Sequence, residues 1–393
     1  MSIPRLDLLI YAHDGRGFGH ASRAIAVAMA FRRLFPDLKL LFVSGTTATA
    51  HLIGSAPLDW IKLPGYATKI IHGKSTGTTG KSNFTDVELG ELRTRTLAQI
   101  IELYRPRCVL VDHMPQGKHK ELLSALSVSK IHKTRWVLGI RGIVGDVAGV
   151  WSDLARTIFV KYYHGLLWYG DTTVLGSKSI NKLQHQFSTH PVETGYVSRM
   201  AEISYWKTKS VSPFPRLAGV VAVPWFGEKS DVILDHLPDA LMRLGDAYGR
   251  WKIFIAKEFS SSQCKIFEKL RSLAFCDIDT PSNAYLDALS NCKTAIIYGG
   301  YNSLTDVLFT RTPTLVLLRA MQDLEQQEHL QALIQSRTAH LIVREEKKIQ
   351  TMDLVTDLKH LLTVPFPPSK QIQLTGAESA AKYLHNLLTT PVS

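Results

Sequence analysis

The chain alternates short apolar segments with longer segments of helical spacing, and this alternation constrains its fold more than any other feature. Apolar residues recur at helical intervals in residues 21–35, directly after a short apolar run at residues 6–13. Strands that alternate with helices favour a parallel sheet covered by helices on both faces. The predicted strands of the first half are residues 6–13, 38–45, 60–64, 107–113, 134–142, 165–171 and 190–197, and the predicted helices are residues 21–35 and 87–106.

The same pattern starts again after residues 199–217, which contain two prolines and no regular periodicity. A chain of 393 residues is too long for one ordinary core, so two domains are expected. The fold class is therefore α/β with two Rossmann-like domains. The expected division is residues 1–200, a linker at 201–217, a second domain at 218–370 and a final helical segment at 371–393.

Two segments interrupt the regular pattern. Residues 65–86 are rich in Gly, Ser, Thr and Lys, which predicts a mobile surface loop that contacts substrate or is disordered. The spelling Asp277-x-Asp279 occurs in the metal sites of some enzymes, but here we interpret it as a chance match. Residues 279–284 are a better candidate for a loop that contacts a nucleobase.

The positive charge is concentrated in the first half. The net charge is +12, and residues 1–200 contain 25 Lys and Arg residues against 14 Asp and Glu residues, whereas residues 201–393 contain 21 against 20. This split predicts an anionic partner or surface for the first half, with a solvated basic face as the simpler alternative. A non-catalytic binder of nucleic acid or anionic lipid is a further alternative, with nucleic acid the less favoured ligand.

Composition also favours a location in the cytoplasm. No apolar run is long enough to span a bilayer, and the first residues lack a basic start followed by a long apolar stretch. The cysteines Cys108, Cys264, Cys276 and Cys292 are scattered without a CxxC pair. We therefore expect free thiols in a reducing compartment.

The segment GRGFGH at residues 15–20 lies where a predicted strand passes into a helix. Its glycines let the backbone approach a ligand closely, but their alternating spacing is only a weak indication of phosphate binding. The segment places His20 at the carboxyl ends of the strands, where open α/β sheets bind ligands and where a histidine can act as a general base. Gly17 and Gly19 are expected to leave space for an acceptor substrate, which His20 would deprotonate.

Asp112 ends another buried strand of the first half, so it should lie at the same edge as His20. A hydrogen bond between the two would fix the imidazole tautomer and stabilise its protonated form, although Asp112 could also cap the following segment. His13 and His113 are rival bases that we expect to be structural. Arg141 lies in a Gly-flanked turn and is expected either to contact an anionic acceptor or to form a salt bridge.

The segment IIYGGYNSLTDVLFTRTP in the second half is the more specific motif. Gly299 and Gly300 can bring backbone amides to a diphosphate, with a helix N-terminus behind them. Asp306 lies further along that helix, where its carboxylate can accept the hydroxyls of a ribose. The other expected donor contacts are the side chains of Asn302 and Ser303 and, on the next helix, Glu325 and Gln326.

This second segment resembles the donor-binding segment of the MurG-like branch of the GT-B glycosyltransferases, known as the carboxy-terminal domain of glycosyltransferase family 28. Asp306 keeps the spacing of seven residues before Pro313, with aspartate in place of the usual glutamate. In the first half, the segments YAHDGRGFGHASRA, VDHMPQGKHKELL, VLGIRGIVGD, YYHGLLWYGD and TGYVSR resemble a group of predicted bacterial glycosyltransferases allied to that branch. The resemblance covers most of residues 7–345.

The resemblance implies a GT-B fold, in which two Rossmann-like domains face a central cleft and the C-terminal helix crosses back to the first domain. It implies inverting, metal-independent transfer from a nucleotide sugar, with a UDP-sugar such as UDP-GlcNAc favoured and no other cofactor. His20 would be the base and Asp112 its partner. The acceptor would carry a hydroxyl or amine. The basic first half adds the expectation that this acceptor is anionic or lipid-linked, with peripheral contact to the membrane. A nucleotide-sugar hydrolase or 2-epimerase of the same fold is the alternative.

The sequence departs from the family pattern in one turn. After the first strand of the second half, these enzymes usually carry a Gly-rich turn near the donor phosphates, but the segment VAVPWFGEKSD keeps only Gly227 there. Either the diphosphate is held mainly by residues 299–303, or the donor is handled differently.

Overall fold

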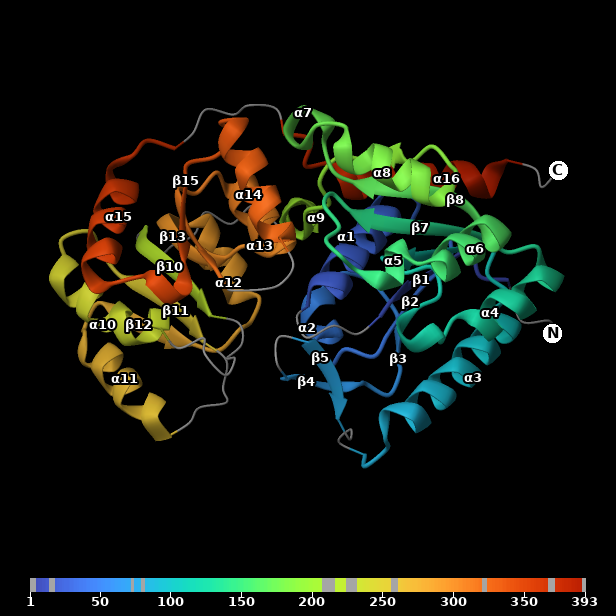
Figure 1. Ribbon diagram of the computed structural model, residues 1–393, viewed down its shortest axis with the longest axis horizontal. Helices are drawn as coiled ribbons and strands as arrows, with labels where there is room; N and C mark the ends of the chain where they lie inside the picture. The colour runs from blue at the N-terminus through green and yellow to red at the C-terminus, as the bar shows by residue number, and fades with distance from the viewer. Residues whose placement is uncertain are drawn as a thin grey trace. The chain divides into compact units, whose positions relative to one another are not determined.

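The computed structural model divides the chain into two compact units, and each is built on its own sheet (Figure 1). Unit 1 comprises residues 1–206 and 372–393, and unit 2 comprises residues 207–371. The structure describes residues 5–13, 18–71, 74–78, 82–206, 216–223, 232–255, 261–319, 324–366 and 372–390, with the backbone alone for residues 67–71, 74–78 and 261–264.

The sheet of unit 1 has seven parallel strands in the order β3-β2-β1-β6-β7-β8-β9. The strand order reverses between β1 and β6, which is where open sheets of this kind bind ligands. The predicted parallel sheet is confirmed. Its strands are β1 (Leu8–Ala12), β2 (Leu40–Ser44), β3 (Trp60–Lys62), β6 (Cys108–Asp112), β7 (Arg135–Arg141), β8 (Tyr163–Tyr169) and β9 (Val192–Glu193).

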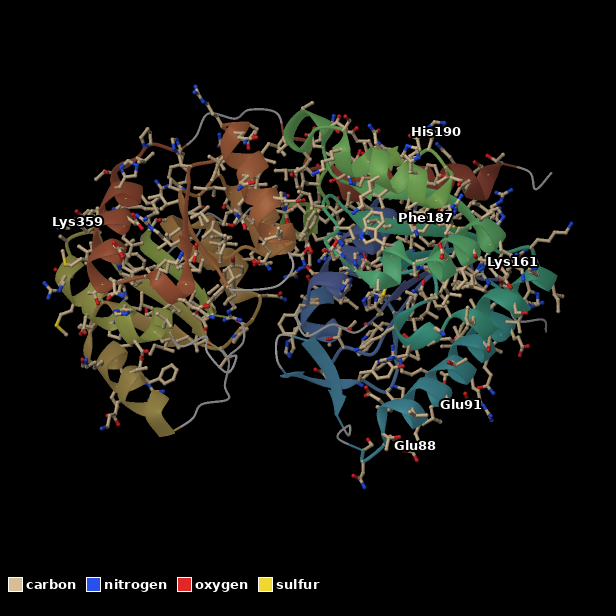
Figure 2. The ribbon with its side chains drawn as sticks, in the orientation of Figure 1. Glu88, Glu91, Lys161, Phe187, His190 and Lys359 are labelled. Carbon is tan, nitrogen blue, oxygen red and sulfur yellow. The ribbon has the colours of Figure 1, made fainter. Side chains whose placement is uncertain are left out.

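Helices cover both faces of this sheet because alternate strand residues are apolar on both sides. Leu9 and Tyr11 of β1 pack with α3, α4, α6 and α8, and Phe187, labelled in Figure 2, is buried in the same cluster. On the other face, α1 packs against β1 and α16 packs against β6. The main helices are α1 (Gly19–Leu34), α3 (Asp86–Tyr104), α4 (Leu123–Val128), α6 (Asp153–Tyr162), α8 (Lys178–Phe187) and α16 (Gly376–Thr389).

Shorter helical segments connect these elements. The short α-helices are α2 (Thr49–Ile53), α5 (Ala148–Trp151), α7 (Thr172–Leu175) and α9 (Arg199–Trp206), and the 3₁₀ turns are η1 (Lys118–Lys120) and η2 (Ser129–His132). Within the described ranges, no helix combines the length and the apolar character that a membrane span requires.

Helix α3 shows how local sequence sets the ends of an element. The Thr85 hydroxyl accepts a hydrogen bond from the backbone N–H of Glu88, and the Glu88 carboxylate accepts one from the backbone N–H of Thr85. This reciprocal capping box satisfies amide groups that the first helical turn leaves without partners. The helix ends at Tyr104, two residues before Pro106, which disfavours a longer helix.

Residues 65–86 were expected to form a loop, and this expectation is wrong for their central part. Strands β4 (Ala67–Ile71) and β5 (Lys74–Thr78) pair antiparallel as a two-stranded sheet. The β-branched residues of these two stretches favour extended backbone, and the glycine and serine content of the segment obscured that signal.

The sheet of unit 2 has six parallel strands in the order β12-β11-β10-β13-β14-β15, with the reversal between β10 and β13. Helices α10, α11 and α15 share one buried cluster with it, while α12 and α13 contact β10 and β13. The strands are β10 (Leu217–Val223), β11 (Trp251–Ile255), β12 (Cys276–Asp279), β13 (Cys292–Tyr298), β14 (Thr314–Leu318) and β15 (Leu341–Glu345). The helices are α10 (Val232–Leu244), α11 (Ser261–Ser272), α12 (Ala284–Ser290), α13 (Tyr301–Thr310), α14 (Glu325–Gln335), η3 (Glu346–Lys348) and α15 (Thr351–Thr363).

The expected linker at residues 201–217 is shorter than predicted, because its first six residues belong to helix α9. That helix is held to unit 1 by Glu202, whose carboxylate accepts two hydrogen bonds of 3.1 Å from Arg33 of α1. Arg33 also binds Glu378 of α16 at 3.1 Å. Because these partners are distant in sequence, local periodicity could not reveal the helix.

The C-terminal segment returns to unit 1, as the fold class predicted. The backbone N–H of Tyr196 donates to the carbonyl of Gln373 at 2.6 Å, and Gly376 donates to the carbonyl of Tyr196 at 3.0 Å. Helix α16 then packs along α1. Gly165 of β8 makes room for it, because a Cβ there would lie 2.1 Å from the hydroxyl of Tyr383.

Candidate active site

Four polar side chains meet at the point in unit 1 where the strand order reverses. His13 directly follows β1, Asp112 is the last residue of β6, His113 follows it, and His20 is the second residue of α1. The ring of His20 lies 4.0 Å from that of His13 and 5.3 Å from that of His113, measured between ring centroids. The carboxyl ends of two adjacent parallel strands therefore carry one compact cluster.

Asp112 is the anchor of this cluster. Its carboxylate accepts a hydrogen bond of 2.5 Å from Nδ1 of His20 and is bound by the guanidinium of Arg23, with Nη2 at 2.9 Å from Oδ2 and Nε at 3.2 Å from Oδ1. Both Asp112 and Arg23 are 2% exposed. The structure thus brings His20 and Asp112 together and adds a buried cation behind them.

Arg23 is the residue of this site that the sequence analysis missed. It lies in the buried, alanine-rich part of α1, one turn after His20, so both side chains project from the same face of the helix. An arginine among alanines, three residues from a candidate base, was the available signal.

The charges of the site favour an ionised Asp112 and a neutral His20. Burial acts to raise the pKa of Asp112, but Arg23 and then His20 outweigh it, and the pKa falls to about 2. Burial lowers the pKa of His20 below its ordinary value, against the opposing attraction of Asp112. Because a carboxylate only accepts hydrogen bonds, Nδ1 of His20 carries the proton and Nε2 carries the lone pair.

His13 and His113 are more deeply buried than His20. They are 6% and 3% exposed, whereas the side chain of His20 is 19% exposed, and burial keeps the pKa of both well below the ordinary histidine value. His113 has a left-handed backbone with φ of 78°, and its Nδ1 has no hydrogen-bond partner among the residues that the structure describes. These two uncharged rings therefore pack beside the His20 ring without adding charge to the site.

The three acceptor contacts predicted from sequence have different outcomes. Arg141 ends β7, next to β6, and its charge helps to lower the pKa of His20 and His113, so it belongs to the same edge. Gly19 is the first residue of α1. Gly17 lies outside the described residues.

The candidate donor site lies in unit 2, where β13 meets the N-terminus of α13. Gly299 and Gly300 follow β13 directly, but their amides are already engaged. Gly299 donates to the carbonyl of Leu317 at 3.3 Å, and Gly300 donates to that of Tyr298 at 2.8 Å. Binding of the diphosphate by these two glycines stays a prediction, and in this structure both amides bond to carbonyl groups of unit 2.

The two glycines have no side chains, so they leave the N-terminus of α13 uncovered. Gly300 is the residue before α13, the helix has no side-chain cap, and a Cβ on Gly300 would meet no atom within 4 Å. A Cβ on Gly299 would lie 3.2 Å from Oε1 of Gln326, which places the second residue of α14 beside Gly299. Glu325, the first residue of α14, is the neighbour of Gln326 in sequence.

The remaining predicted donor residues lie along α13. Asn302 and Ser303 are half-buried in its first turn, and Asp306 is half-buried one turn later. Tyr285 of α12 was not predicted. Burial, and then the charge of Asp306, raises the pKa of Tyr285 well above its ordinary value, and its buried hydroxyl has no hydrogen-bond partner within the described ranges.

Two further expectations concern unit 2. Asp277 and Asp279 belong to strand β12, and residues 280–283 after it form the loop that was expected there. Asp277 is bound by Arg250 at 2.7 Å, and Asp279 lies 3.5 Å from Nζ of Lys252, so each carboxylate faces a cation. Gly227 and its altered turn lie outside the described residues.

Comparison with known proteins identifies the fold. No family model matches the chain, and no curated protein is similar to it in sequence. Among solved structures, MurG of Acinetobacter baumannii is similar over 98% of both chains, with 11% identity and a TM-score of 0.53. The UDP-GlcNAc 2-epimerase of Methanocaldococcus jannaschii is similar over 97% of this chain and 99% of its own, with 11% identity and a TM-score of 0.63.

A third structure, the UDP-GlcNAc 2-epimerase of Neisseria meningitidis bound to UDP-GlcNAc, is similar over 98% of this chain and 99% of its own, with 12% identity and a TM-score of 0.63. The predicted fold class is thereby confirmed: the chain has the two-domain GT-B fold. At these identities the likeness concerns the fold, so the chemistry has to be argued from the residues of the site.

Proposed function

We propose that this protein is an inverting, metal-independent glycosyltransferase that moves a sugar from a nucleotide diphosphate sugar to a hydroxyl or amine acceptor. The observation that carries the proposal is the 2.5 Å hydrogen bond from Nδ1 of His20 to the buried carboxylate of Asp112. A neutral imidazole held in this tautomer at the ligand-binding edge of a parallel sheet is suited to remove a proton.

In the proposed reaction, Nε2 of His20 takes the proton of the acceptor as its oxygen or nitrogen attacks the anomeric carbon. The bond from that carbon to the diphosphate breaks, and the leaving group departs with its electron pair, so the configuration inverts. The resulting imidazolium lies against the ionised Asp112, which stabilises it. Arg23 keeps Asp112 ionised and oriented.

For donor binding, we propose that the diphosphate faces the N-terminus of α13, where the aligned peptide dipoles favour negative charge. Asn302 and Ser303 in the first turn can donate to phosphate oxygens, and Asp306 can accept the ribose hydroxyls. Gln326 and Glu325 of α14 are suited to the hydroxyls of the sugar. A UDP-sugar, with UDP-GlcNAc as the first to test, is the favoured donor because several solved structures of this fold are named for UDP-GlcNAc or contain it.

Metal-independent transfer is part of the proposal, and the partners of Asp112 support it. One ligand atom from each of His13, His20 and Asp112 lies within 4.8 Å of the others, a spacing that could hold an ion. However, both oxygens of Asp112 already accept bonds from Arg23, and a divalent cation there would face that guanidinium. The helix N-terminus supplies the stabilisation of the leaving group that a cation would otherwise give.

The acceptor class is part of the proposal. Arg141 lies at the same edge as His20 and favours an acceptor with negative charge, either soluble or lipid-linked. The cytoplasm and the membrane surface facing it are the corresponding locations.

The test is incubation of the protein with UDP-GlcNAc and other nucleotide sugars, with and without a panel of hydroxyl and amine acceptors. The products are followed by nuclear magnetic resonance. Acceptor-dependent release of UDP, with an inverted anomeric linkage, is the expected result. An isomerised or free sugar formed equally fast without an acceptor would identify an epimerase or hydrolase instead and would overturn the proposal.

A further inference from the structure

A pocket of about 600 Å³ lies within unit 1, away from the cluster around His20. Five of its lining side chains are cationic at neutral pH, and none of the described residues that line it is acidic. The cationic residues are Arg5, Arg105, Arg107, Lys133 and Arg135. Its volume falls in the range of sites for small molecules.

The pocket lies at the opposite end of the strands that carry the candidate active site. Arg107 directly precedes β6, whose last residue is Asp112, and Arg135 begins β7, whose last residue is Arg141. With a rise of about 3.3 Å per residue, five residues of strand separate the two ends by about 16 Å. The pocket is therefore a separate site rather than an extension of the first.

The arginine side chains of the pocket bind mainly neutral groups. Arg5 donates to the carbonyl oxygens of Arg105 at 2.8 Å and His132 at 2.5 Å. Arg135 donates to the carbonyl oxygen of Thr390 at 2.6 Å. Carbonyl groups orient guanidinium groups without cancelling their charge. Burial, followed by repulsion from Arg107 and Arg105, lowers the pKa of Arg5, against the opposing attraction of Asp7.

Contacts that stabilise the fold account for only part of the positive charge of these five side chains. Arg107 pairs with Asp7 at 3.0 Å and also donates to the carbonyl of Leu388 at the end of α16. A helix C-terminus carries about half a negative charge, so helix and Asp7 together offset about one and a half of the five positive charges. The described residues that line the pocket thus include five cations and no carboxylate.

We propose that this pocket binds a phosphate-bearing ligand through a group with two or three negative charges, such as a diphosphate or a phosphate monoester. Guanidinium groups match phosphate oxygens in paired hydrogen bonds, and Lys133 adds a mobile point charge. A soluble phosphorylated molecule and a phospholipid headgroup share this chemistry. The site is independent of the proposed transfer reaction.

The test is calorimetric titration of inorganic pyrophosphate into the full chain without nucleotide, because UDP carries a diphosphate and would compete for the pocket. Any binding at the proposed donor site of unit 2 is identified because it persists in the pocket variants. Lys133→Glu reverses an exposed charge of the pocket and should weaken binding at least tenfold. The matched control is Lys161→Glu, which makes the same change on α6 outside the pocket (Figure 2) and should leave binding unchanged. Arg5→Gln is the second pocket variant, and it decides the result if Lys133→Glu does not fold.

The absence of saturable binding to the wild-type protein, or equal weakening by Lys161→Glu, would overturn the proposal. Flotation with phosphatidylcholine vesicles, with and without phosphatidic acid, distinguishes the two sources of phosphate. Flotation that requires phosphatidic acid and is lost in Lys133→Glu identifies a headgroup. Pyrophosphate binding without flotation identifies a soluble ligand.

Discussion

Arg23 shows how one residue sets the chemistry of its neighbours. Its guanidinium contacts both oxygens of Asp112, and its charge acts on His20 as well. The pair predicted from sequence, His20 and Asp112, therefore works as a group of three. Spacing along the chain could place His20 and Asp112 at one sheet edge, but it could not show that the side chain of Arg23 in α1 binds the Asp112 carboxylate.

Replacing Arg23 by methionine should move the acid limb of kcat/KM to higher pH. Removing the cation lets the pKa of Asp112 rise toward its ordinary value, and it removes a repulsion that lowers the pKa of His20. The base is then protonated at a higher pH, and unfolding free energy should fall by about 3 kcal/mol because a buried charge loses a partner. Rate profiles from pH 5 to 8 provide the measurement, with exposed Arg95→Met as the control. An unshifted acid limb would contradict this role.

His13 and His113 should make unit 1 sensitive to acid. Their folded pKa values lie well below 6.5, so the unfolded chain binds more protons below that pH. The stability that they contribute is complete above pH 6.5 and is lost as the pH falls toward their folded pKa values.

Between pH 6.5 and 5.5 each of these histidines should cost about 1 kcal/mol of unfolding free energy. His113→Asn, which suits the left-handed backbone, should remove one such contribution from the difference between urea unfolding curves at the two pH values. His190→Asn, at an exposed position labelled in Figure 2, should leave that difference unchanged. The same pH dependence in His113→Asn and the wild-type protein would argue against a neutral buried His113.

At the scale of elements, a buried ion pair joins several segments of unit 1. Arg93 of α3 binds Glu121 with Nε at 2.5 Å from Oε2, and both side chains are fully buried. Glu121 also accepts hydrogen bonds from the hydroxyls of Tyr11 in β1 and Tyr66, while Arg93 donates to the carbonyl of Pro64 at 2.6 Å. The pair thus connects the sheet, α3 and the segment that leads into β4.

Breaking this pair should be costly and non-additive. Arg93→Met and Glu121→Leu should each lower the unfolding free energy by about 3–5 kcal/mol, because each leaves a buried charge alone. The double variant leaves no such charge, so its loss should be smaller than the sum of the two by at least 2 kcal/mol. Urea unfolding of the four proteins measures this coupling, and strictly additive losses would show that the two side chains act independently.

Periodicity predicted most of the elements but missed those with mixed composition. The central strands were found because they are continuous apolar runs. In contrast, β15 contains charged residues at its end, and helix α6 was not among the helices predicted for the first half. The structure ends α6 at Tyr162 and begins β8 at Tyr163, two residues before the strand predicted at residues 165–171. Residues 163–169 form a strand because both faces of this segment are buried in the sheet. This burial depends on pairing with the neighbouring strand β7.

At the scale of the whole molecule, the structure shows where part of the positive charge of the first half lies. The basic excess of residues 1–200 suggested an anionic acceptor, yet five cations of unit 1 gather at the end of the sheet opposite His20. Net charge predicts that an anion binds, but only the fold shows at which edge. Alternation predicted two α/β domains and the resemblance implied the GT-B fold, whereas the strand order and the packing of His13 and His113 around His20 required the structure.

The measurement that tests the central claim most directly compares the wild-type protein with His20→Gln. Acceptor-dependent release of UDP from a saturating UDP-sugar is measured, together with the Kd of UDP. Removal of the base should lower the rate by about 10²- to 10⁴-fold. The Kd of UDP should not change, because the proposed nucleotide site lies on α13 of unit 2. Undiminished release by His20→Gln, or no acceptor-dependent release by the wild-type protein from any nucleotide sugar, would contradict the assignment of His20 as the base of a glycosyltransferase.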